Sequence, residues 1–394
     1  MADQKELFTI TYGGWYQRTT IHLTEIYDFL KFCKIRLKLS MSILKSYHTN
    51  LKLKQVTREV GYLEYIQAET EEGIVIKYYE DGLYILKLES EDIAKGKKIL
   101  KNYYEKFFEP AIKYIFSLGA PIPKILADIT SVHPTVISQQ SEDPSDFDIE
   151  SDLYGEVYSK ISSKEMTVYK TPEYIFALAD KTKFEMLDDI VGMQIFFREF
   201  KDQLEKYIDI HRIVWEEIDK IKDKKSIKGK EVEKVRFKLE MYNKTVNLIT
   251  HRINQMGTYV TTRASISKSL EIENYLVNLF QYKFEVLSNT LEYIKEIWAM
   301  TNSYLQSAIQ IVVEIQDKTT DASIKSLRLV TALGVVAGLG RYLFQEEFPK
   351  VTIEGLGYFV ILILFTWLLD MLIVWIYRQI KYKLRFVKGV SRFE

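Results

Sequence analysis

The chain has 394 residues, of which 54 are basic and 54 are acidic, so its formal net charge is zero. A general nucleic-acid binder carries a basic excess, and the charge balance therefore excludes this class. The single cysteine, Cys33, excludes an internal disulfide framework and any metal site built from several cysteines.

Residues 1–180 mix strand and helix patterns, and we expect them to form a cytoplasmic α/β domain. Segments 7–12 and 19–23 read as strands on either side of Gly13-Gly14, and segments 74–79 and 83–88 read as a hairpin around Asp81-Gly82. Residues 26–47 and 93–118 have helical periodicity. The acidic stretch 138–152 reads as an exposed loop.

The apolar period becomes helical from residue 184 onward. Residues 181–265 predict an antiparallel helical hairpin with a basic turn at 222–230 and a break at 257–263. Residues 266–326 predict a stalk helix that continues to residue 342, spanning on the order of 110 Å at ~1.5 Å per residue. Its heptad-like apolar stripe favours packing against other helices and consists of Leu276, Phe280, Leu287, Leu291, Ile294, Trp298, Leu305 and Val312.

Two apolar stretches in the last third predict transmembrane helices, at 327–344 and 355–377. The second is long enough to cross a bilayer, which takes ~20 residues, and its only charge is Asp370. The first is shorter, but its Gly334 and Gly338 would allow helices to approach closely. We therefore expect an α+β membrane protein, with the cytoplasmic domain and the stalk attached to a membrane hairpin.

The flanking charges predict the orientation of this hairpin. Basic residues precede the first span and dominate the tail 378–394, whereas the loop 345–354 is acidic and is expected to be external. Both termini are therefore expected to be cytoplasmic, with the hairpin in the cell (inner or plasma) membrane. No signal peptide is recognised before the domain, which agrees with this orientation.

A mostly polar stripe follows the lower stalk into the first span in steps of three and four. If several copies surround an axis, this stripe predicts a water-filled pore in which a ring of Asp317 binds cations. The alternative is that the stripe is only the solvated face of a stalk. The predicted pore-lining residues are Gln306, Gln310, Asp317, Thr320, Leu327, Thr331, Gly334 and Gly338.

This order of elements resembles the CorA family of divalent cation channels over nearly the whole chain. Residues 337–344, AGLGRYLF, resemble the family's stretch leading into its Gly-Met-Asn motif. The resemblance implies a homopentamer in the lipid bilayer that takes Mg²⁺ or a related ion as substrate or regulator. It also implies that the first span lines the pore, and it implies no other cofactor.

The Gly-Met-Asn motif itself is absent, because Arg341, Tyr342 and Leu343 stand in its place. Leu343 cannot accept hydrogen bonds from a hydrated ion, and Mg²⁺ gives up its water reluctantly. Arginines at the predicted pore mouth would repel cations unless they pair with Glu346 and Glu347. The alternatives are therefore a pore of different, even anion, selectivity, or a non-conducting membrane-anchored structural or sensory protein. A calcium-uniporter-like pore is disfavoured, since Gly355-Leu356-Gly357 occupies the place of its acidic motif.

Other candidate chemistry is sparse. Asp370 lies within an apolar stretch, and we expect it to contact Arg328 or Thr331 on the first span. The five histidines do not cluster in sequence, and the common nucleotide-binding, protease and esterase motifs are absent. We therefore predict that the protein is not an enzyme.

Overall fold

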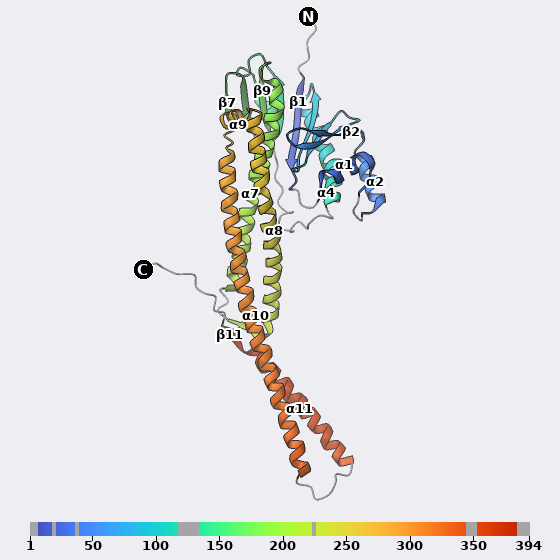
Figure 1. The fold of residues 1–394 in the computed structure, drawn as a ribbon, viewed down its shortest axis with the longest axis vertical. Helices are drawn as coiled ribbons and strands as arrows, with labels where there is room; N and C mark the ends of the chain where they lie inside the picture. The colour runs from blue at the N-terminus through green and yellow to red at the C-terminus, as the bar shows by residue number, and fades with distance from the viewer. Residues whose placement is uncertain are drawn as a thin grey trace, which may run out of the picture. The chain divides into compact units, whose positions relative to one another are not determined.

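The structure is a computed structural model that describes residues 7–17, 21–35, 39–116, 134–222, 226–343 and 353–383. The chain divides into two units (Figure 1). The first comprises residues 1–210 and 248–296, and the second comprises residues 211–247 and 297–394.

A mixed sheet with flanking helices forms the first unit. Its strands are β1 (Phe8–Trp15), β2 (Leu53–Val60), β3 (Glu64–Thr70), β4 (Val75–Tyr79), β5 (Leu83–Ser90), β6 (Thr135–Gln140), β7 (Ser159–Ser162), β8 (Met166–Lys170) and β9 (Tyr174–Ala179). Its shorter helices are α1 (Leu23–Phe32), α2 (Met41–Asn50), α3 (Ile93–Tyr103), the π-helical turn η1 (Tyr104–Phe108), α4 (Glu109–Phe116), α6 (Ser151–Tyr154) and α9 (Glu273–Phe280).

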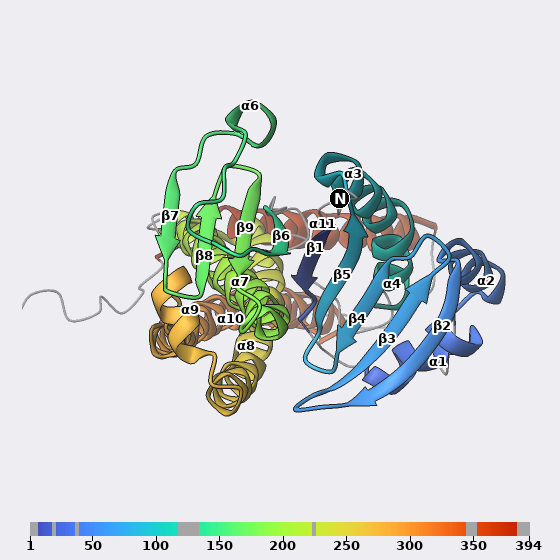
Figure 2. The same ribbon diagram turned by 90° about the horizontal axis from the view of Figure 1, so that it is seen from above.

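The nine strands pair in the order β2-β3-β4-β5-β1-β6-β9-β8-β7, which can be followed across Figure 2. Every pair in this sheet is antiparallel except β6 and β9. The predicted strand at 7–12 and the predicted hairpin around Asp81-Gly82 are confirmed as β1 and as β4–β5. The predicted strand at 19–23 is wrong where it is described, because α1 begins at Leu23.

Side chains alternate across the sheet and form a core on each face. Ile10 of β1 belongs to a large apolar cluster that also contains Phe29, Leu100 and Phe108 from α1, α3 and η1. The odd-numbered residues of β1 face the other side of the sheet. There the centre of the Trp15 ring lies 5.4 Å from that of the Phe200 ring on α7 (Phe184–Lys222). The sheet is therefore covered on both sides, and each face buries its apolar side chains against helices.

A buried ion pair fixes the β4–β5 turn to α8 (Gly229–Ser269) within the first unit. Arg263 Nε and Nη2 donate to the two carboxylate oxygens of Asp81 at 2.6 and 2.9 Å, and the side chains are 6% and 4% exposed. The guanidinium also lies 4.9 Å from the centre of the Tyr79 ring. The predicted helix break at 257–263 is wrong, because this segment lies within α8.

The stalk helix predicted from residue 266 to residue 342 is also interrupted. The chain turns after α8, forms α9, and turns again before α10 (Phe284–Leu343). Glu271 and Gln281 adopt left-handed backbone conformations with φ of 56° and 61°, which end the preceding helices. The predicted apolar stripe is nevertheless confirmed as a packing surface, since all eight of its side chains, from Leu276 to Val312, are buried.

Parts of α7, α8 and α10 form the second unit together with α11 (Ile353–Gln379) and two short strands. β10 (Ser226–Lys228) lies at the turn between α7 and α8 and pairs antiparallel with β11 (Lys381–Lys383), which follows α11. Figure 1 shows α11 running back beside the end of α10. Within the predicted basic turn at 222–230, strand β10 is therefore hydrogen-bonded to strand β11, which follows α11.

The predicted transmembrane helices are not supported. Across the described residues, no helix combines the length and mean hydropathy that crossing a bilayer demands. Residues 327–343 form the end of the 60-residue helix α10, in which Arg328 and Thr331 are exposed, and α11 holds Asp370 within its apolar run. The membrane-protein class, and the membrane and channel assignments that depended on it, are therefore corrected to an α+β fold with a nine-stranded sheet and long helices.

Candidate functional site

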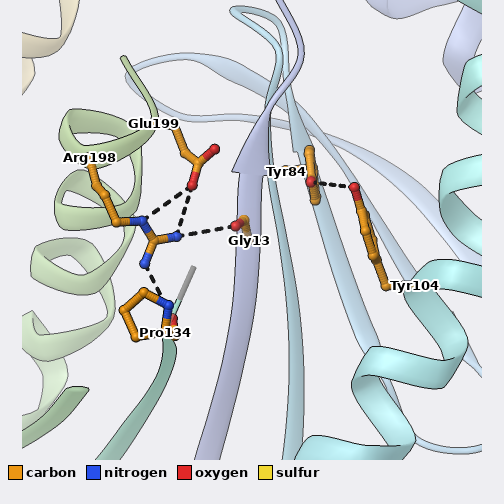
Figure 3. Close-up of polar contacts among 6 residues, drawn as sticks. All are labelled: Gly13, Tyr84, Tyr104, Pro134, Arg198 and Glu199. Carbon is orange, nitrogen blue, oxygen red and sulfur yellow. Dashed lines mark hydrogen bonds and ion pairs between the residues drawn. The ribbon is translucent and has the colours of Figure 1, made fainter. Parts of the chain in front are cut away.

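A well-covered polar cluster of the first unit lies where β1 and β6 separate. These strands pair only through Thr9–Thr11 of β1, although β1 continues to Trp15. Arg198 of α7 reaches this point and donates from Nη2 to the Gly13 carbonyl at 3.4 Å and from Nη1 to the Pro134 carbonyl at 3.3 Å (Figure 3). One guanidinium therefore joins the two chain segments where their backbone ladder ends.

Glu199 balances the charge of this guanidinium. Arg198 Nη2 and Nε lie 2.9 and 3.2 Å from Glu199 Oε1, and the two side chains are 11% and 12% exposed (Figure 3). An ion pair that is this well covered is costly to break, because the remaining charge stays out of water. The pair is suited to holding the sheet together at this point.

A network of tyrosines occupies the opposite side of β1. Tyr84 Oη donates to Tyr104 Oη at 2.9 Å (Figure 3), and Tyr104 Oη donates to Glu109 at 3.4 Å. The Tyr84 and Tyr104 rings stack with an interplanar angle of 8°. Gly14 permits this arrangement, because a Cβ atom there would lie 2.3 Å from Tyr84 Oη.

Burial keeps these phenols protonated. It raises the pKa of Tyr104 to about 12 and raises the pKa of Tyr12 and of Tyr84 still further above the ordinary phenol value. At neutral pH the phenols are therefore protonated and can donate hydrogen bonds. Together with the Arg198–Glu199 pair, these hydrogen bonds help to hold the strands and helices around β1 together.

A second polar cluster lies in the helices of the second unit. His211 Nε2 and Thr301 Oγ1 are 2.7 Å apart, and the Thr301 hydroxyl donates to the Ile297 carbonyl. When the Thr301 hydroxyl donates to Ile297, Nε2 is the donor to Thr301. The imidazole also lies edge-to-face with Trp298, with ring centres 5.6 Å apart. Burial lowers the pKa of His211 from its ordinary value, which favours the neutral ring.

This environment predicts a pH-dependent stability. The folded state binds the His211 proton less readily than the unfolded state, so His211 lowers the stability as the pH falls below about 6.5, the unfolded value. One proton changes the free energy of unfolding by at most ~1.4 kcal/mol per pH unit. Urea unfolding of the native chain and of His211→Gln between pH 5 and pH 8 measures the effect. A stability difference between the two chains that does not change with pH would contradict the prediction.

The predicted pore-lining residues lie on α10 and are mostly exposed. Asp317, Thr320, Leu327 and Thr331 are open to solvent, as are Gln306, Gln310 and Gly338, whereas Gly334 is half-buried. The Gln306 amide donates to Asn243 Oδ1 on α8 at 2.8 Å, and the Thr320 and Thr331 hydroxyls donate to carbonyls one turn earlier. Whether the stripe lines a lumen stays a prediction.

The remaining predicted residues are placed only in part. Arg341, Tyr342 and Leu343 end α10 at positions whose side chains lie outside the described set, and Glu346 and Glu347 fall in the undescribed segment 344–352. Arg328 is exposed and Asp370 is half-buried. Among the described residues, Asp317 included, no group of three or more His, Cys, Asp or Glu side chains could hold a metal ion.

A shallow pocket of about 480 Å³ lies between α8 and α10 in the second unit. Arg236 is one of its lining residues, and it donates to Glu240 at 2.8 Å and to Gln316 at 2.9 Å. The other lining residues are Lys230, Glu233, Lys234 and Phe237. Because the basic and acidic side chains are mixed, the pocket selects no single class of ligand.

Sequence reasoning missed the Arg198–Glu199 pair, because a consecutive Arg and Glu in a helix gives no signal until strand pairing is known. It recognised the apolar run of α11 but assigned it to a bilayer. Neither a protein-family model nor a curated protein matches the sequence, so the resemblance to the CorA family stays a prediction.

Proposed function

We propose that the chain is a non-enzymatic scaffold protein that assembles with copies of itself through α11. The carrying observation is that α11 leaves large apolar side chains exposed on most of its circumference. These are Ile353, Leu356, Val360, Ile361, Ile363, Leu364, Phe365, Trp367, Leu368, Met371, Leu372, Trp375 and Ile376.

One narrow face of α11 is better covered than the rest. Thr366, Leu369, Asp370 and Ile373 are half-buried, and their spacing places them on a single side of the helix. On α10, Val330 is buried, and Ser326 and Gly334, one turn before and after it, are half-buried. We take the side of α11 that contains these half-buried residues as the side facing α10, although the space around Gly334 is open, so α10 covers only one side of α11.

Leaving the uncovered side of α11 in water is energetically unfavourable compared with burying it. Burying one large apolar side chain contributes roughly 1.5–3 kcal/mol, so covering several of them contributes on the order of 10 kcal/mol. Monomeric proteins rarely leave a contiguous apolar patch of more than a few hundred Å² in water, and such a patch generally marks an interaction site. This comparison favours a partner for α11.

Copies of the same chain fit this surface best. The exposed part of α11 is apolar in several directions, so a flat partner would cover only a fraction of it. Neighbouring hairpins in a closed ring would cover it from two sides, and closed symmetry is the usual arrangement of homo-oligomers. The number of copies in such a ring is tested directly by a measured mass.

Charges placed in the exposed face should separate the copies. Ile361, Leu368 and Trp375 follow one another at intervals of seven residues and are 61%, 57% and 60% exposed. We expect Ile361→Lys/Leu368→Lys/Trp375→Lys to shift the purified chain to its monomer mass of 46.4 kDa in sedimentation equilibrium. The matched control is Asn254→Lys/Thr258→Lys/Thr261→Lys on an exposed face of α8, which should leave the native mass unchanged. An α11 variant that keeps the native oligomer mass would overturn the proposal.

A further inference from the structure

We propose that Lys87 is a reactive amine that binds a small 2-oxo acid by forming a Schiff base with its carbonyl carbon, and that Lys77 holds the carboxylate of this ligand. The inference is independent of assembly through α11, because both lysines lie in the first unit. It is carried by the placement of two lysines and one aspartate on one face of the sheet.

The two lysines are neighbours on adjacent strands. Lys77 of β4 pairs with Ile85 of β5, and Lys87 follows Ile85 by two residues, so the two lysines lie diagonally on the same face. On the other side of β5, Lys87 pairs with Thr11 of β1. The side chains of Lys77 and Lys87 are 21% and 14% exposed, so both are largely covered.

One carboxylate serves both lysines. Asp188, near the start of α7, accepts from Lys77 Nζ through Oδ2 at 3.2 Å and forms an ion pair with Lys87 through Oδ1. A single carboxylate does not neutralise two ammonium groups, so the cluster favours the loss of one proton. Burial disfavours the charged form of a lysine, and the more covered Lys87 is therefore the one that loses it.

The effect on Lys87 is large. Burial and the neighbouring Lys77 ammonium lower the pKa of Lys87 from 10.5 to about 7, whereas Asp189 acts in the opposite direction. At neutral pH about half of the Lys87 side chains therefore carry a free amine, roughly a thousandfold more than for a lysine of ordinary pKa. A lysine that is desolvated and adjacent to another cation is activated for attack on carbonyl groups.

Charge balance selects the ligand. The amine nitrogen bonds to the carbonyl carbon, and the carbonyl oxygen leaves as water with one proton from the amine and one from solution, which leaves an iminium cation. Asp188 pairs with this iminium as it does with the Lys87 ammonium. The Lys77 ammonium has three donors and is then without a full counter-charge. A carboxylate beside the carbonyl carbon supplies that charge, which identifies a 2-oxo acid.

Labelling of the native chain with glyoxylate, a small 2-oxo acid, tests the amine. Sodium cyanoborohydride reduces the Schiff base to a stable secondary amine, which peptide mass spectrometry locates. At pH 7 we expect Lys87 to react about tenfold faster than Lys201, since limited access offsets part of its advantage in free amine. Lys201 is the internal control, because it is 60% exposed and pairs with Glu205 on the same helix.

The pH dependence of this labelling distinguishes a reactive amine from an accessible one. The ratio of the Lys87 rate to the Lys201 rate should fall as the pH rises from 7 to 10, because exposed lysines in general become free amines only near the upper limit. A Lys87 rate no higher than that of Lys201 at pH 7 would overturn the inference. A preference for Lys87 that persists in the urea-unfolded chain would also overturn it.

The role of Lys77 is tested with acetaldehyde, which has the carbonyl group without the carboxylate. With each rate divided by that of Lys201, native Lys87 should favour glyoxylate over acetaldehyde severalfold, and Lys77→Gln should remove most of this preference. Lys54→Gln is the matched control, because Lys54 is exposed near the start of β2, pairs with Glu69 at 3.7 Å and should leave the preference unchanged. Equal normalised rates of native Lys87 with both probes would overturn the assignment to 2-oxo acids.

Discussion

Asp81→Ala is expected to lower the free energy of unfolding of the first unit by about 3–5 kcal/mol, because it leaves the buried Arg263 charge without its carboxylate. Both side chains are less than a tenth exposed, and two hydrogen bonds of 2.6 and 2.9 Å are lost. Asp81 Oδ1 also accepts from the Leu83 amide at 3.2 Å, so the β4–β5 turn loses a bond of its own.

Urea unfolding monitored by near-ultraviolet circular dichroism measures this loss. Trp15 is a suitable probe, because its Nε1 donates to the Asp81 carbonyl at 2.7 Å. The control is Lys52→Ala, which removes an exposed ion pair with Glu72 and should cost less than about 1 kcal/mol. Replacing both partners, as Asp81→Leu/Arg263→Met, should cost less than Asp81→Ala alone. Equal losses for Asp81→Ala and Lys52→Ala would contradict the prediction.

The second large effect is expected at the separation of β1 and β6. Arg198→Met keeps much of the volume of the side chain but removes the guanidinium that holds the Gly13 and Pro134 carbonyls and the Glu199 carboxylate. We expect a loss of about 3–5 kcal/mol, as for other covered ion pairs from which one partner is removed. Amide hydrogen exchange should also become faster in β6.

Arg198→Lys keeps the positive charge but removes the forked geometry of the guanidinium, so it tests the two contributions separately. A lysine ammonium can neutralise Glu199, but it cannot reach two carbonyls and a carboxylate in the forked arrangement of a guanidinium. Its stability should therefore lie between those of the native chain and Arg198→Met. If Arg198→Met unfolds at the same urea concentration as the native chain, the guanidinium does not hold the two strands together.

Much of the local structure could be predicted from the sequence. The Asp-Gly pair at 81–82 defined the β4–β5 hairpin, because the chain needs a positive φ there, and Gly82 has a φ of 93°. The long apolar period from residue 184 defined α7, and the stripe from Leu276 to Val312 identified the buried face of α9 and α10. These features depend on neighbours within a few turns of the chain.

The errors occurred where distant contacts override local preference. Gly257 suggested a break, but α8 passes through it, and Arg263 is held by Asp81, 182 residues away in sequence. Conversely, Glu271 and Gln281 end helices in left-handed conformations that glycine usually occupies. Because neither position is a glycine, the sequence did not indicate that the helices end there. The Arg198 cluster depends on the pairing of β1 with β6, which the sequence alone does not reveal.

The apolar run of α11 shows the same limit for function. Its composition predicted a transmembrane helix, which the described helices contradict, and the structure leaves its large apolar side chains exposed. Composition did not identify what covers them. What covers α11 therefore has to be identified by measuring assembly directly.

The mass of the purified native chain tests self-assembly most directly. Sedimentation equilibrium over a hundredfold range of protein concentration should give a single mass that is a fixed multiple, two or more, of 46.4 kDa. A mass of 46.4 kDa throughout this range, from a chain with native circular dichroism, would contradict assembly through α11.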